Sequence, residues 1–246
     1  AGEYVLQLSA DDSEQTSSRS IVVHYATGDQ GASFTSQDIG SVGLAGSVNA
    51  SGQAITLAGS GGDIWNSADE FHFYHSPLEG DGSLTARIVS QENTNPWAKA
   101  GLMIRDSLNA NSTHGFIAVT PANGLALQSR LTTGAGSNNS SGGGFILPLW
   151  LKIERSGTLI TVSHSSDGTN WTAAGTLNPN MSGADYIGFA VTSHDNGQIT
   201  EVVFDNFESL SQYTGASISL PPHANLTVGG THPLTAPDSD PNQPTE

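Results

Sequence analysis

The sequence predicts an all-β protein built as an antiparallel β-sandwich or jelly roll. Its 246 residues include 29 glycines and many Ser, Thr and Asn, while charged residues make up only 12%, a composition typical of turn-rich β structure. Apolar or alternating runs of strand length follow one another along the chain, and turn-forming dipeptides separate several of them. Because no long stretch keeps the helix period without glycine or β-branched residues, we expect almost no helix.

Several runs have the length and alternation of strands. In chain order they read EFHFYH, SLTARIVS, AGLMIR, HGFIAVT, LALQSRL, LWLKIER, TLITVSH, DYIGFAVTSH and TEVVFDNFESL. Dipeptides that favour positive φ angles punctuate these runs and indicate hairpin-type turns. They are Asp81-Gly82, Asn123-Gly124, Ser156-Gly157, Asp167-Gly168 and Asn196-Gly197. This regular spacing predicts sheets of antiparallel strands packed face to face.

A glycine-rich tract, TTGAGSNNSSGGG, occupies residues 132–144. It is too polar and too flexible to pack in a core, so we expect an exposed loop inside the domain. Two interpretations are open for this loop: it covers a binding face, or it behaves only as a linker.

The chain divides into three parts by composition. Residues 31–210 contain the predicted sandwich. Residues 1–30 carry two alternating runs joined by an acidic turn, and residues 211–246 are a tail rich in Pro, Asp and Ser with one strand-like piece. Neither end has enough apolar residues to form a domain alone. We expect the ends either to pack on the central domain or to be fragments of neighbouring modules.

Charge and cysteine content exclude several classes of function. Only 7 Lys and Arg stand against 23 Asp and Glu, for a formal net charge of −16. Phosphate contacts need cations, so binding to nucleic acid or to anionic membrane surfaces is disfavoured, whereas divalent cations suit this charge. The chain has no cysteine, which excludes disulfides and thiolate sites. No apolar run approaches the roughly 20 residues that span a bilayer, so we expect no membrane insertion.

Many segments, in order, resemble the β-sandwich modules of the concanavalin A-like lectin/glucanase superfamily found in large secreted bacterial proteins. They are QDIGSVGLAGS, GSGGDIWNSADEFHFYHSPLEGDGSLTARI, WAKAGLMIRDS, FIAVTPANG, LWLKIERSG, SSDGTNW, YIGFAVTSHDNG and VVFDNFES, spanning roughly residues 34–210. The N-terminal YVLQLSADDSEQTSSRSIVV is similar to the last strands of cadherin-like or PKD-like modules, and SISLPPHANLTVGGTHPLTAPDSDPN looks like the start of another. The resemblance implies a fold rather than one function.

The stretch NPWAKAGLMIRDS, residues 95–107, carries the strongest indication of a site. Read as a strand, it places Trp97, Lys99 and Arg105 on one face and apolar residues on the other. Six of the seven cations lie between Arg87 and Arg155. An aromatic ring with placed donors is what sugar recognition needs. The alternative is that these cations pair with acidic residues on adjacent strands.

The predicted ligand-binding residues are Trp65, Trp97, Lys99, Arg105 and Arg130. Trp65 follows a glycine-rich turn, where an exposed indole can stack on a sugar, although it could equally plug the end of the sandwich. Trp97 or Trp65 would stack on the sugar, while Lys99, Arg105 and Arg130 would donate hydrogen bonds. Such a cationic pocket would favour uronic or sulfated sugars.

Calcium is the metal that the resemblance implies. Lectin-like sandwiches commonly hold a structural calcium ion with carboxylates and carbonyls. By resemblance to jelly-roll modules in which the first and last strands share that ion, Asp38 and Asp205 are the candidate ligands. The histidines are scattered, without the close spacing of a zinc motif.

The sequence therefore predicts a non-catalytic carbohydrate-binding or adhesive module of a secreted or cell-surface protein, with a polysaccharide or glycan as partner. No paired-carboxylate pattern, nucleophile elbow or metalloprotease motif points to an enzyme. The alternative is a structural repeat or assembly subunit of an extracellular array or filament, in which partial modules at the ends pair with neighbouring copies.

Overall fold

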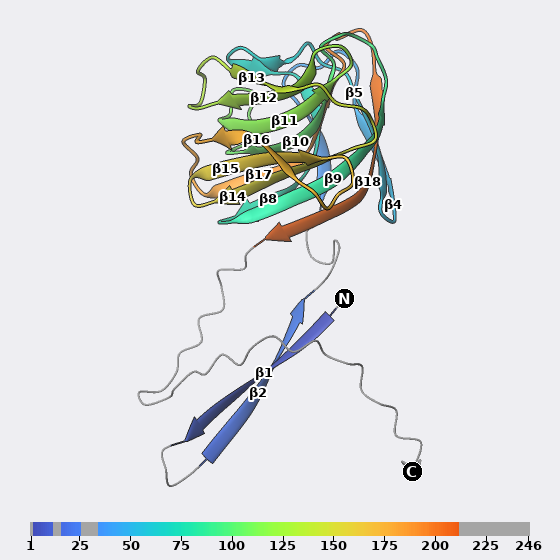
Figure 1. The fold of residues 1–246 in the computed structure, drawn as a ribbon. Helices are drawn as coiled ribbons and strands as arrows, with labels where there is room; N and C mark the ends of the chain where they lie inside the picture. The colour runs from blue at the N-terminus through green and yellow to red at the C-terminus, as the bar shows by residue number, and fades with distance from the viewer. Residues whose placement is uncertain (1, 12–15, 26–33, 212–246) are drawn as a thin grey trace. The chain divides into compact units, whose positions relative to one another are not determined.

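The computed structural model describes residues 2–11, 16–25 and 34–211. At the N-terminus, β1 (Gly2–Asp11) and β2 (Thr16–Tyr25) pair with each other in an antiparallel register that runs from Gly2 opposite Tyr25 to Asp11 opposite Thr16. The two predicted alternating runs of the N-terminal segment thus form a hairpin (Figure 1). Its acidic turn and the tail from residue 212 lie outside the described residues.

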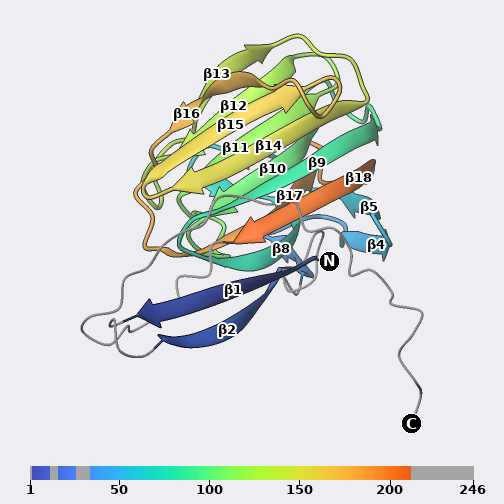
Figure 2. The ribbon, with the colours of Figure 1, turned by 60° about the horizontal axis from the view of Figure 1, so that its bottom comes forward.

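Residues 34–211 form a sandwich of two seven-stranded antiparallel sheets (Figures 1 and 2). Sheet 1 runs in the spatial order β13 (Asn138–Gly143), β12 (Gly124–Arg130), β11 (His114–Thr120), β10 (Lys99–Arg105), β17 (Ala184–Thr192), β8 (Phe71–Glu79) and β3 (Thr35–Ile39). Sheet 2 runs in the order β16 (Thr172–Leu177), β15 (Leu159–Ser165), β14 (Leu149–Ser156), β9 (Gly82–Gln91), β18 (Thr200–Ser211), β5 (Ala54–Gly59) and β4 (Ser47–Ser51). A short hairpin of β6 (Ile64–Trp65) and β7 (Ala68–Asp69) forms a separate two-stranded sheet.

The main core lies between the two sheets because alternate residues of their strands turn inward. Leu102 and Ile104 of β10 face this core together with Leu151 and Ile153 of β14, and all four are fully buried. The period-two pattern of the sequence determines which side chains of each strand face this core. The predicted all-β sandwich is confirmed, and among the described residues there is no helix.

A second apolar cluster covers the outer face of sheet 1. Met103, Phe116, Ala118 and Phe73 point away from the main core and pack with Ile64 of the β6–β7 hairpin. The segment of residues 106–112 adds two further contacts, through Leu108 and Ala110. Every residue of β10 and of β11 is consequently buried. The sequence pattern predicted an open surface on the outer face of β10, but other segments largely cover this face.

Three of the five predicted turns are true hairpins. Those at Asn123-Gly124, Ser156-Gly157 and Asp167-Gly168 connect strands that pair within one sheet. The turns at Asp81-Gly82 and Asn196-Gly197 instead lead from β8 to β9 and from β17 to β18, which lie in different sheets. A turn dipeptide reverses the chain but does not say which sheet receives the next strand.

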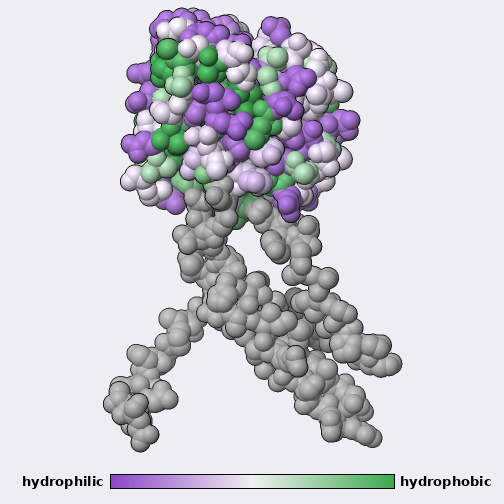
Figure 3. Space-filling view, turned by 180° about the vertical axis from the view of Figure 1, so that it is seen from behind, coloured by the Kyte–Doolittle hydropathy of each residue, from purple (hydrophilic) through white to green (hydrophobic). Residues whose placement is uncertain are grey.

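All nine predicted strand runs are strands, and the described residues contain further, mostly short strands that the sequence pattern did not predict. The glycine-rich tract 132–144 is not only a loop: β13 lies inside it and pairs with β12 at the edge of sheet 1. On the face shown in Figure 3, hydrophobic residues form small separate patches among hydrophilic ones. Within the described ranges, no helix has the length and apolar character needed to cross a membrane.

Candidate ligand-binding groove

A hollow of about 420 Å³ opens beside the outer face of sheet 1. We call it the indole hollow, because two tryptophans line it. Its lining residues come from loops and strands far apart in the sequence, and they are Asp63, Trp65, Trp97, Lys99, Gln128, Asn139 and His194. Three of the five predicted ligand residues, Trp65, Trp97 and Lys99, therefore meet in one place. Their role in binding stays a prediction.

Small residues in the sheet leave room for the hollow. In the register of sheet 1, Gly101 lies opposite Ala118, and Ala118 lies opposite Ala126. This row separates Lys99 on β10 from Gln128 on β12, so no large side chain of these strands stands between them. Because side chains alternate across a strand, all of these residues share the outer face.

Lys99 forms the charged side of the hollow. Its side chain is 2% exposed, its ammonium group donates to Asp63 Oδ1, and it lies 5.9 Å from the centroid of the Trp97 ring. Burial lowers the pKa of Lys99, while the charge of Asp63 acts in the opposite direction. His194 Nδ1 lies 3.3 Å from the other oxygen of Asp63. Asp63 thus stands between Lys99 and His194 and balances the lysine charge.

Gln128 contributes a hydrogen-bond acceptor without a partner. The residue is only 2% exposed, and its Oε1 atom accepts no hydrogen bond from the described residues. Buried polar atoms in proteins are nearly always satisfied, so this unsatisfied acceptor in a lining residue is a candidate contact for a ligand.

Local turns hold Trp97 at the rim. The Asn95 side chain accepts a hydrogen bond from the Trp97 backbone N–H at 2.9 Å, and the Ala98 N–H donates to the Asn95 carbonyl. Asn123, in the turn before β12, donates to the Pro96 carbonyl at 2.7 Å. The backbone of the loop is therefore fixed, while the Trp97 indole remains 39% exposed and available for contact.

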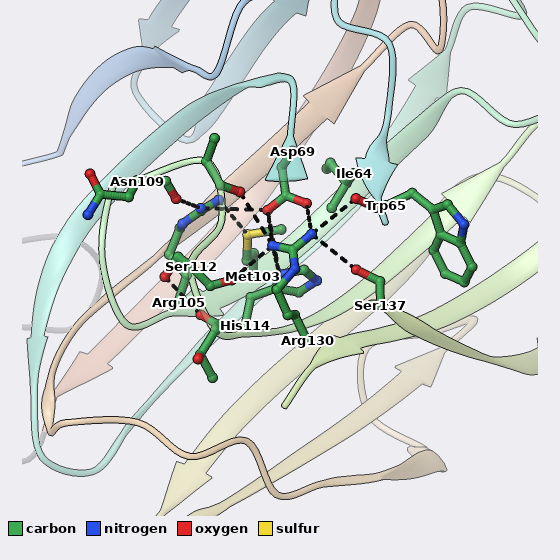
Figure 4. Close-up of polar contacts among 12 residues, drawn as sticks. Ile64, Trp65, Asp69, Met103, Arg105, Asn109, Ser112, His114, Arg130 and Ser137 are labelled. Atoms are coloured by element: carbon green, nitrogen blue, oxygen red, sulfur yellow. Dashed lines mark hydrogen bonds and ion pairs between the residues drawn. The ribbon is translucent and has the colours of Figure 1, made fainter. Parts of the chain in front are cut away.

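Arg130 holds the β6–β7 hairpin, and with it Trp65, against sheet 1 (Figure 4). Its guanidinium group donates to the Trp65 and Asn66 carbonyls, each at 3.1 Å, and to Ser137 Oγ at 3.1 Å. The Trp65 side chain extends away from this cluster, as Figure 4 shows. Arg130 thus acts on the position of Trp65 from beneath the surface.

Asp69 lies at the centre of the buried cluster. Its carboxylate accepts hydrogen bonds from Arg130 at 2.6 and 2.9 Å and lies 3.6 Å from both Arg105 and His114. Burial raises the pKa of Asp69, whereas the hydrogen bond from Arg130 and the arginine charges act against that rise. Burial lowers the pKa of His114 well below its ordinary value, which keeps the imidazole neutral between two arginines.

The prediction that Arg105 and Arg130 face a ligand needs correction. Both side chains are fully buried. Arg105 donates to the Ser107 and Asn109 carbonyls at 2.7 and 2.6 Å and lies over the Phe71 ring, 5.0 Å from its centroid. Residues 106–112 and the β6–β7 hairpin cover these arginines, so their N–H groups meet internal acceptors.

The remaining cations of the predicted cluster lie on the other sheet. Arg87, Lys152 and Arg155 belong to β9 and β14, and they pair with Asp205, Glu154 and Asp185, respectively. The alternative of pairing with acidic residues on adjacent strands holds for Arg87, whose partner lies on β18. Lys152 instead pairs within its own strand, and Arg155 pairs with a residue of sheet 1. The cations therefore form two groups on two sheets instead of one binding surface.

The residues proposed for calcium do not fit a shared ion. Asp38 accepts hydrogen bonds from His72 Nδ1 at 2.7 Å and from the Gly46 N–H at 3.1 Å, in sheet 1. Asp205 lies in sheet 2 and accepts two hydrogen bonds from Arg87, which lower its pKa. In residues 34–211, no group of three or more His, Asp and Glu residues is arranged to hold a metal ion.

Four residues that line the indole hollow were absent from the predicted ligand residues, namely Asp63, Gln128, Asn139 and His194. Asp63 precedes Trp65 by two positions and sits in the same glycine-rich turn, so its proximity was a usable signal. Asn139 lies in the tract taken as a loop, and its position depends on β13 pairing, which places it opposite Gln128. That pairing has no local sequence signature, because β13 is polar throughout and mostly exposed.

Comparison with known proteins bears on the fold. No protein-family model and no curated protein matches the chain. A functionally unknown protein from Saccharomyces cerevisiae has a similar structure, with 18% sequence identity and a TM-score of 0.55, and the match covers 68% of this chain and 92% of that one. At this identity the likeness shows the sandwich fold alone.

Two other solved structures match less well. One is the GH43 protein BlXynB from Bacillus licheniformis, with 14% identity and a TM-score of 0.48, where the match covers 64% of this chain and 33% of that one. The other is the exoplasmic/lumenal domain of VIP36 in its Ca²⁺/Man3GlcNAc-bound form, with 13% identity and a TM-score of 0.47, covering 75% and 87%.

Proposed function

We propose that this chain is a non-catalytic carbohydrate-binding module of a secreted or cell-surface protein, and that the indole hollow is its binding site. The observation that carries the proposal is the meeting of two indoles, Trp65 and Trp97, with the unpartnered buried acceptor of Gln128 in one hollow. Small-ligand sites combine apolar walls with a few fixed polar groups in this way.

The chemistry of the hollow suits a sugar ring. An indole offers a flat apolar surface for the C–H face of a pyranose, and the 39% exposed Trp97 ring is held in place by its loop. Gln128 Oε1 would accept a hydrogen bond from a sugar hydroxyl, and the Asn139 amide offers both a donor and acceptors. Apolar and polar contacts therefore come from opposite sides of the hollow.

The charges favour neutral sugars over the uronic or sulfated sugars that the sequence suggested. Lys99 is paired with Asp63, and Arg105 and Arg130 are buried beside Asp69. An acidic sugar would meet the Asp63 carboxylate, whose side chain is 23% exposed, without an uncompensated cation to offset the repulsion. A neutral glycan needs no charge partner and loses nothing from this arrangement.

A glycan array tests the proposal, with a Trp97→Ala variant and a matched Trp171→Ala control. Trp171 lies between β15 and β16 of sheet 2, beside Lys152, and does not line the hollow. Its removal is therefore the same chemical change at another site. We expect the wild type and Trp171→Ala to bind the same neutral glycans, and Trp97→Ala to lose at least tenfold in affinity.

Circular dichroism and thermal unfolding would establish that both variants keep the native fold. Exposed Trp97 makes no contribution to either apolar cluster, so we expect little change in stability for Trp97→Ala. Equal glycan binding by wild type and a folded Trp97→Ala variant would contradict the site. A complete lack of binding on a broad array would contradict the function.

A further inference from the structure

A second hollow, of about 590 Å³, borders the indole hollow. Asp63, Trp65 and His194 line both hollows, so these three residues form a shared wall between them. We call the second one the polar hollow. Each hollow alone is within the range of about 300–1,000 Å³ that holds one small ligand. We call the two neighbouring hollows together the groove.

The polar hollow is lined differently beyond the shared wall. Ser41, Asn66, Ala68 and Glu70 contribute to it, and Trp65 is the one indole among its described lining residues. Glu70 Oε2 accepts hydrogen bonds from the Gly62 N–H at 3.1 Å and from Asn196 Nδ2 at 2.6 Å. This carboxylate is therefore fixed at the lining of the polar hollow.

The hairpin that separates the hollows is rigidly placed. Asp69 of β7 is tied to Arg130, and the Asp69 N–H donates to the Ala110 carbonyl at 2.9 Å. The Glu70 N–H donates to the Asp63 carbonyl at 2.7 Å, which closes the base of the turn that carries Asp63. The shared wall is thus a fixed divider between two positions of a groove, with stacking on one side and hydrogen bonding on the other.

We infer that the groove binds an extended neutral oligosaccharide and not a single sugar, with one unit against the indoles and the next in the polar hollow. This inference rests on the proposed function and names its ligand class. Crossing the divider places a glycosidic linkage beside Trp65, Asp63 and His194. The second unit then adds its own hydrogen bonds to affinity at the entropic cost of a single association event.

Isothermal titration with neutral oligosaccharides of one to four units, built from glucose, mannose, galactose or xylose, tests the inference. We expect affinity to rise at least tenfold from one unit to two or three in the best series. Ser41→Phe places a ring in the polar hollow and should remove this rise, while binding of the single unit stays within about twofold. Ser47→Phe, on the exposed edge strand β4 of sheet 2, is the matched control.

The outcomes separate the inference from the function on which it rests. Equal affinity for one and for several units, together with loss of binding in Trp97→Ala, would overturn the extended groove and leave the carbohydrate site standing. A length dependence that Ser41→Phe leaves unchanged would place the second unit elsewhere and also overturn the inference. No binding of any series would overturn both.

Discussion

Replacement of Asp69 by asparagine is expected to destabilise the sandwich strongly. The change keeps the shape of the side chain but removes a fully buried negative charge that lies 2.6 Å from Arg130 and 3.6 Å from Arg105. One carboxamide oxygen can still accept from Arg130, but the new NH₂ group points a donor at a guanidinium. Two buried cations are then left without a carboxylate.

The magnitude follows from the burial of these groups. Removing one partner of a buried ion pair costs about 3–5 kcal/mol, because the remaining charge stays buried without compensation. For domains of about 150–250 residues, each 1 kcal/mol corresponds to roughly 2–4 °C in Tm. We therefore expect Tm to fall by about 6–20 °C in Asp69→Asn.

Urea unfolding followed by tryptophan fluorescence measures the loss directly. Glu154→Gln makes the same chemical change at a carboxylate that is 48% exposed and pairs with Lys152 on the surface, where a loss of about 0–1 kcal/mol is expected. If Asp69→Asn lost no more than this control, the carbonyl acceptors around Arg105 and Arg130 would be enough to balance both charges, and our account of the cluster would be refuted.

Two further predictions concern packing and pH. Gly101→Ala should lower the free energy of unfolding by about 1–3 kcal/mol or more, because an added Cβ would lie 1.9 Å from the Ile117 carbonyl oxygen. Gly136→Ala is the control and should change stability little, because an added Cβ there would have no atom within 4 Å. Equal urea midpoints for the two variants would contradict this prediction. Burial and the charge of Arg105 lower the pKa of His75 from 6.5 to about 4. The folded state thus disfavours protonation, so the stability from this group is complete above pH 6.5 and is lost as pH falls toward 4, at roughly 1.4 kcal/mol per pH unit. In His75→Gln, the fall in the free energy of unfolding between pH 6.5 and 4 should be shallower; a slope identical to that of the wild type would show that other groups determine it.

The strands could be predicted because their signal is local. A period-two pattern can be read within a short segment such as AGLMIR or LWLKIER, and it predicts that one face of the strand is buried. The side chains that share a strand or its end, such as Trp97 and Lys99, were therefore placed together correctly. The convergence of Trp65 on the same hollow depends on a separate hairpin and had no comparable signal.

The burial of Arg105 and Arg130 could not be read from their own strands. Their covering is supplied by the β6–β7 hairpin and residues 106–112, and the neutralising Asp69 lies 61 positions from Arg130 in the sequence. A partial warning was present in β10 and β11, where Met103 and Phe116 occupy the supposedly polar face. Strands with apolar residues on both faces are covered on both sides.

The buried ion cluster beneath the groove also separates two sets of residues that are under different evolutionary constraints. Asp69, Arg105 and Arg130 hold the divider in place without reaching solvent, whereas Trp97, Ser41 and Asn139 shape the groove without holding the fold together. Mutations at the second set are therefore expected to change the groove at little cost in stability. This sandwich is accordingly a suitable scaffold for laboratory selection of new ligand specificities, with libraries confined to the rim and the cluster left intact.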